Sequence, residues 1–78
     1  MSEEKTIFRH GVPFRLTRVN LHVVTPGDRI DLTTDGSGPH IEVRDLKITN
    51  KGNIQLYASI FGNRVERLLE DRKVWKVA

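Results

Sequence analysis

The 78-residue chain contains no cysteine, which excludes disulfide frameworks, thiolate nucleophiles and cysteine-ligated metal sites together. It also lacks any apolar run near the roughly 20 residues that cross a bilayer as a helix. The opening MSEEKTIFRH carries acids where a secretory signal needs a basic and then an apolar start. These absences predict a soluble, cytoplasmic protein with no membrane contact.

Short catalytic and metal-binding motifs are also missing. No serine lies in a Gly-x-Ser-x-Gly elbow, and the glycines around Ser37 lack the Lys-Ser/Thr of a phosphate loop. The three histidines fall in different segments without ligand spacing, and Asp28, Asp31 and Asp35 do not match a calcium loop. The sequence therefore predicts no enzyme activity, no metal site, no cofactor and no small-molecule substrate.

The length suits one small domain. We expect residues 1–5 to form a flexible tail and residues 6–78 to fold together. Apolar residues make up only 37% of the chain, yet they recur at regular spacing, which disordered chains do not show. A core this small offsets little more than the ordering cost of the chain, so we expect marginal stability.

The segment 13–34, PFRLTRVNLHVVTPGDRIDLTT, looks like a long strand folded back on a second one. Phe14 and Leu16 share one face of the first strand, but the apolar residues within 19–23 alternate in the opposite parity. One face can hold both sets only if an extra residue is inserted near Thr17-Arg18, as in a β-bulge. We therefore expect a sharp bend there.

Turn signals divide the middle of the chain. Residues 25–28, TPGD, fit a type II turn, because Pro presets φ at the second position and Gly accepts the positive φ of the third. Residues 35–39, DGSGP, form a polar connection that we expect to be the most mobile loop. Residues 40–49 change parity near Arg44-Asp45, which predicts a second bulge, and residues 53–60 alternate as a regular strand.

The segment after Phe61 has two interpretations. As a helix, Asn63 is a suitable N-cap, Glu66 completes the capping pattern, and the apolar residues share one face. As a strand, Gly62-Asn63 forms a two-residue hairpin turn, but the residues that follow do not alternate cleanly. We favour a short helix or helical turn over residues 63–71.

Five or six strands, the last over residues 73–77, predict a mainly all-β fold arranged as a strongly bent antiparallel meander. Bulges give a small sheet the curvature to close on itself and hide its edges. An SH3-like small barrel is the first expected architecture and an OB-like barrel the second. An open sheet covered by the helix is the remaining alternative.

Positive charge is concentrated at the two ends of the chain, whose formal net charge is +3. Residues 1–24 hold four Lys/Arg against two acids, residues 25–50 three against five, and residues 51–78 six against three. Two basic ends that meet in the fold would attract phosphate groups. The ordinary alternative is a solvated surface on which acids and bases alternate.

The basic ends support a first functional hypothesis, nucleic-acid binding (RNA or DNA) with an exposed aromatic ring for base stacking. The residues assigned to it are Arg15, Arg18, His22, Tyr57, Arg64, Arg67, Arg72, Lys73 and Lys76. The alternative hypothesis is a protein-interaction module or homo-oligomer, which binds through a strand edge or through the face of Tyr57 and Phe61. Salt dependence of binding separates the two.

Overall fold

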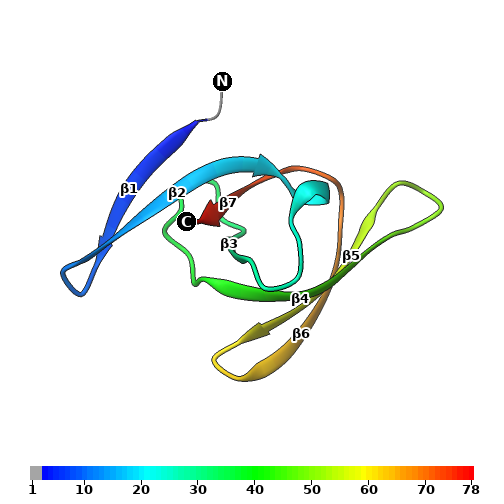
Figure 1. The fold of residues 1–78 in the computed structure, drawn as a ribbon. Helices are drawn as coiled ribbons and strands as arrows, with labels where there is room; N and C mark the ends of the chain where they lie inside the picture. Colours follow the sequence, from blue (N-terminus) through cyan, green and yellow to red (C-terminus); the bar gives the residue numbers. More distant parts are fainter. Residues whose placement is uncertain (1–2) are drawn as a thin grey trace.

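The computed structural model describes residues 3–78, which form a single antiparallel sheet (Figure 1). Its strands are β1 (Glu4–Arg9), β2 (Val12–Asn20), β3 (Arg29–Asp31), β4 (Ile41–Ile48), β5 (Ile54–Ile60), β6 (Asn63–Leu69) and β7 (Lys73–Val77). A 3-10 turn, η1 (Leu21–Val23), follows β2. The mainly all-β, bent antiparallel fold is confirmed, with seven strands in place of five or six.

The N-terminal hairpin joins β1 and β2 through a two-residue turn at His10 and Gly11, whose φ angles are +51° and +75°. Figure 1 shows this hairpin reaching away from the rest of the sheet. β1 begins at Glu4, so the strand overlaps the tail expected over residues 1–5. The first two residues of that tail lie outside the described residues.

Within residues 3–78, no helix has the length and apolar character needed to cross a membrane.

The strand order is β1-β2-β7-β3-β4-β5-β6. The last strand in the chain therefore lies between β2 and β3, with Val74 opposite Val19 on one side and Lys76 opposite Ile30 on the other. The prediction that residues 13–34 form a hairpin is wrong, because β7 occupies the place between its two arms. β2 and β3 are consequently parallel to each other, since each pairs antiparallel with β7.

Two local features of the middle segment form as predicted. The turn over residues 25–28 is closed by the Asp28 N–H, which donates to the Thr25 carbonyl at 3.1 Å. The pairing of β4 with β5 shifts between Val43 and Asp45, which confirms the bulge predicted there. Both features depend on neighbouring residues, which is why the sequence pattern identifies them.

The sheet is bent, as predicted, but it does not close into the complete barrel expected of an SH3-like or OB-like architecture. β1 and β6 form its two edges, and no strand within residues 3–78 pairs on their outer sides. The bulge predicted at Thr17-Arg18 is also wrong, because β2 pairs in a continuous register from Val12 to Asn20. Two bulges were expected to curve the sheet enough to close it, and only the one in β4 is present.

β2 needs no bulge because both of its faces are covered. Val19 lies beside Val74 on the side of the main core, whereas Leu16 is buried on the opposite side, beside Gly36 of the loop that follows β3. A Cβ atom added to Gly36 in this loop would lie 2.8 Å from Leu16 Cδ1, so only glycine fits there. The main core consists of Leu21, Val24, Ile30, Ile41, Val43, Ile54, Leu56, Ala58 and Val74.

The helix predicted over residues 63–71 is wrong, and β6 stands in its place. Phe61, with φ of +50°, and the glycine after it form a two-residue hairpin turn that returns the chain along β5. Val65 and Leu69 are four residues apart, a spacing that fits one face of a strand as well as one face of a helix. Leu68 completes the helical pattern but is exposed on the other face. Pairing with β5 outweighs the local helix signals.

Candidate functional site

The structure separates the two basic residues predicted for the first long strand. Because β2 has no bulge, Arg15 and Arg18 point to opposite faces of the sheet. Arg18 lies over the Trp75 ring, 4.9 Å from its centroid, and donates to the Thr34 carbonyl at 3.4 Å. Arg15 is exposed opposite Thr6 of β1. The two arginines do not form one basic surface.

Three more of the predicted residues contact other parts of the chain. His22 Nδ1 lies 2.7 Å from Asp71 Oδ2, Arg72 donates to the Leu32 carbonyl at 2.8 Å, and Lys76 Nζ lies 3.8 Å from Asp28 Oδ2. Lys73 is exposed opposite Asn20. These internal contacts reduce the positive charge that is free to meet a phosphate group.

Tyr57 and Arg64 are predicted site residues that the structure brings together. They line a depression of about 470 Å³ on the outer face of β5 and β6, together with Arg44 and Glu66. Arg67 points to the opposite face of β6, because it is three residues from Arg64 in a regular strand. The predicted basic set is therefore spread over several surfaces of the sheet.

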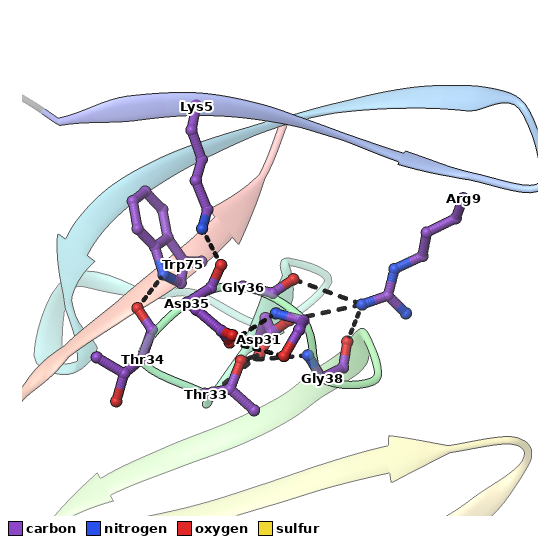
Figure 2. A network of polar contacts seen from close by, with 10 residues as sticks. Lys5, Arg9, Asp31, Thr33, Thr34, Asp35, Gly36, Gly38 and Trp75 are labelled. Carbon is purple, nitrogen blue, oxygen red and sulfur yellow. Dashed lines mark hydrogen bonds and ion pairs between the residues drawn. The ribbon is translucent and has the colours of Figure 1, made fainter.

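The loop over residues 32–38 is tied to the sheet by basic side chains, a feature that the sequence analysis misses. Figure 2 shows Lys5 and Arg9 reaching this loop from β1, with Trp75 beside Lys5. The donors to its carbonyls are Arg72 to Leu32, Arg18 and Trp75 to Thr34, Lys5 to Asp35, and Arg9 to Gly36 and Gly38. Three of these carbonyls, those of Asp35, Gly36 and Gly38, belong to residues 35–39, so the segment expected to be the most mobile is anchored to β1.

Asp31 lies beneath this loop and is 0% exposed. Its Oδ1 accepts hydrogen bonds from the Thr33 N–H at 2.8 Å and the Thr33 hydroxyl at 2.5 Å (Figure 2). The Arg9 guanidinium lies 3.8 Å from Oδ2, which has no hydrogen-bond partner in the described chain. A buried carboxylate is costly without a nearby cation. Arg9 of β1 and the loop therefore stabilise each other.

Asp35 repeats the same motif on the exposed side of the loop. Its Oδ1 accepts hydrogen bonds from the Ser37 hydroxyl at 2.6 Å and the Ser37 N–H at 3.1 Å. The bond from the hydroxyl and then the bond from the N–H lower the pKa of Asp35. The repeated Asp-x-Ser/Thr spacing is the sequence signal for both turns. The cations around them come from distant strands, so that spacing does not reveal them.

His40 follows the loop and packs edge-on against the Phe14 ring, with the centroids 5.2 Å apart. Its Nε2 is buried and has no hydrogen-bond partner in the described chain. Burial lowers the pKa of His40, the charges of Arg9 and Arg29 lower it further, and Asp31 opposes them. The folded state therefore favours the neutral imidazole.

This shift makes the stability of the fold dependent on pH. Below about pH 6.5, the usual histidine pKa, we expect the free energy of unfolding to fall, because the unfolded chain binds a proton that folded His40 resists. The stabilisation that comes from keeping His40 neutral is complete above that usual pKa. It is lost as the pH falls toward the lower pKa that His40 has in the folded state. Urea titrations between about pH 7 and pH 5 measure this slope. His40→Gln should flatten it and His10→Asn, at an exposed turn, should keep it; an unchanged slope in His40→Gln would contradict the assignment.

The edge strand β6 carries exposed apolar side chains. Phe61, in the turn before the strand, is 90% exposed and Leu68 is 59% exposed. A helix over residues 63–71 would leave no strand edge here. The sequence signal for the strand is the two-residue hairpin turn that contains Gly62. The edge of the sheet at β6 thus combines unpaired main-chain groups with exposed apolar side chains.

No group of three or more His, Cys, Asp or Glu residues in the described part of the chain is arranged to hold a metal ion. Comparison with protein-family models, with curated proteins and with solved structures finds no match to the chain. Its function therefore has to be argued from its own surfaces.

Proposed function

We propose that this protein is a cytoplasmic, non-enzymatic interaction module that binds a partner protein by adding a strand of that partner to β6. The observation that supports it is the open β6 edge, flanked by the exposed Phe61 and Leu68. Open edges pair with other chains through main-chain hydrogen bonds, and neighbouring side chains select the partner. A chain without cysteine suits the reducing cytoplasm.

The free main-chain groups of β6 follow from its pairing with β5. Ile60 and Asn63 flank the two-residue turn, and residues in these positions form a doubly hydrogen-bonded pair. Bonding then alternates along the strand, so Arg64, Glu66 and Leu68 direct their N–H and C=O groups away from β5. A partner strand would form its hydrogen bonds with these three residues.

Charge makes this edge selective. Arg64 and Glu66 lie on the outer face with opposite signs, so a strand whose charges alternate in the complementary order is attracted and a like-charged strand is repelled. An uncharged apolar edge would pair with many strands and aggregate. The β6 edge is therefore suited to one kind of partner strand.

A photo-crosslinking amino acid at position 68 is expected to form adducts with a partner protein in living cells, because the Leu68 side chain is exposed beside the free edge. The same amino acid at position 51, where Lys51 lies in the exposed turn between β4 and β5, is the matched control. It should form few adducts. Mass spectrometry identifies the cross-linked molecule.

Glu66→Pro sharpens this test. Proline removes the outward N–H at this position without removing a hydrogen bond to β5. It should therefore abolish the adducts at position 68 while circular dichroism shows an unchanged fold. Adducts that survive Glu66→Pro would rule out strand addition, and the absence of protein adducts would overturn the proposed function. Adducts with RNA or DNA alone would favour the second candidate function.

That second candidate is binding of single-stranded RNA or DNA at the outer face of β4, β5 and β6. The Lys47 ammonium lies 5.7 Å from the centroid of the Tyr57 ring, and Arg44 and Arg64 line the depression beside it. An aromatic ring among cations is the arrangement that stacks bases and neutralises phosphates. Acids on the same face offset these cations: Glu42, Asp45 and Glu66. This balance of charge ranks nucleic-acid binding second.

A further inference from the structure

The order of charges along β6 is complementary to itself when the strand is reversed. We propose that the partner strand is β6 of a second copy of this chain, paired antiparallel about a two-fold axis at Val65. Arg64 of each chain then lies opposite Glu66 of the partner subunit. This inference rests on the proposed function and names the partner of the same edge.

Main-chain geometry limits the registers in which two β6 strands can pair. New hydrogen-bonded pairs must join residues whose main-chain groups point outward on both chains. In β6 these are Arg64, Glu66 and Leu68, at every second position. A slip of one residue would set outward groups against inward ones. The registers therefore differ by steps of two residues, and each symmetric pairing places its two-fold axis at one residue.

Charge selects one of these registers. An axis at Glu66 sets the two Glu66 carboxylates opposite each other, and an axis at Arg64 does the same with two guanidinium groups. Like charges directly opposite each other destabilise a strand pair. An axis at Arg67 sets Glu66 opposite Leu68. Of the axes inside β6, only the one at Val65 places Arg64 opposite Glu66, and the symmetry makes that pair twice.

The same register brings the exposed apolar residues to the interface. Leu68 lies opposite Gly62 of the partner subunit, and Phe61 is level with Leu69 of the partner subunit, each pair occurring twice. Because the axis is two-fold, the interface uses the same patch on both chains and closes after two copies. The expected product is a dimer with one continuous sheet across the interface.

The other edge of the sheet does not offer this match. The residues of β1 that direct their main-chain groups outward are Glu4, Thr6 and Phe8. The acid of β1, Glu4, is one of these residues, whereas its two cations, Lys5 and Arg9, lie at the alternate positions. A register that sets outward groups against outward groups therefore never places Glu4 opposite a cation of β1. The choice of β6 as the dimer edge therefore follows from its alternating charges.

Sedimentation at low salt, over a range of protein concentrations, tests the register. The wild-type chain should form a reversible dimer. Arg64→Glu places two acids opposite each other at both pairs, and Glu66→Arg places two cations there. Each variant alone should dissociate about tenfold more readily or beyond detection. An equimolar mixture of the two should recover a dimer, because acidic and basic strands then meet at both pairs.

Arg67→Glu is the matched control, since this residue points to the other face and lies opposite Asn63 of the partner subunit. It should leave the dimer unchanged. A wild-type chain that stays monomeric at every concentration, an Arg64→Glu dimer as stable as the wild type, or a mixture that stays monomeric would each overturn the proposal. A different protein in the adducts at position 68 would leave the proposed function standing, so the two failures are distinguishable.

Discussion

Replacing Asp31 by alanine is expected to lower the free energy of unfolding by about 3 kcal/mol. The carboxylate is fully buried and accepts two hydrogen bonds from Thr33. Its removal leaves the N–H and hydroxyl of Thr33 without their acceptor, and it deprives Arg9, 3.8 Å away, of a counter-charge. Urea unfolding followed by the fluorescence of Trp75 measures the loss.

Asp35→Ala is the matched control for this prediction. Asp35 makes the same pair of hydrogen bonds, to Ser37, but on the exposed side of the loop. Water replaces the lost carboxylate there, so the loss of stability should be much smaller. Equal losses in the two variants would contradict the importance of burial, because the two motifs otherwise share their hydrogen-bond pattern.

Replacing Trp75 by alanine is expected to lower the free energy of unfolding by about 4 kcal/mol, as for other large buried aromatic residues. The ring is 3% exposed, and the charged groups of Lys5 and Arg18 lie 4.8 Å and 4.9 Å from its centroid. The substitution leaves a cavity and removes both cation–π contacts. Because the only tryptophan is lost, circular dichroism is the appropriate measurement.

Trp75→Phe separates the packing of this ring from its hydrogen bond. The indole N–H donates to the Thr34 carbonyl at 2.9 Å, and its loss alone should lower the free energy of unfolding by about 1 kcal/mol. The aromatic ring still fills most of the space between Lys5 and Arg18. A Trp75→Phe variant as unstable as Trp75→Ala would show that the hydrogen bond dominates, contrary to this expectation.

Both predictions concern the contact between the loop over residues 32–38 and the strands that surround it. Four of the 13 Lys and Arg residues are used in this contact, because Lys5, Arg9, Arg18 and Arg72 all donate to loop carbonyls. The net charge of +3 therefore does not translate into one basic surface. Because these cations bind carbonyls within the protein, fewer of them are free to bind a nucleic acid. The proposed function therefore rests on the strand edge and not on the basic residues.

Features that depend on neighbouring residues could be predicted from the sequence. The alternation of residues 53–60, the turn over residues 25–28 and the bulge at Arg44-Asp45 all form as expected. Each results from the local preferences of a few consecutive residues, such as the fixed φ of proline. The parity change between Leu16 and Val19 is also real, but it reflects two buried faces, which a local pattern does not distinguish from a bulge.

The candidate site could be predicted only in part from the sequence. The sequence predicts a strand edge as one possible binding surface, but the location of that edge on β6 depends on residues 63–69 being a strand. Val65 and Leu69 fit a helix and a strand equally well, and pairing with β5 decided between them. The strand is favoured over the helix by contacts with residues that are distant in the sequence. A short window of sequence does not contain those contacts.

The residue pattern was therefore sufficient for an all-β chain with curved strands, no disulfides and no recognisable catalytic motif. The tertiary structure alone decided that β7 lies between β2 and β3, that β1 and β6 are open edges, and that the loop over residues 32–38 is held by cations from distant strands. The physical reason is the distance along the sequence over which each kind of interaction acts. Alternation and turns follow from adjacent residues, whereas strand order and ion contacts depend on which distant segments bury the most surface together.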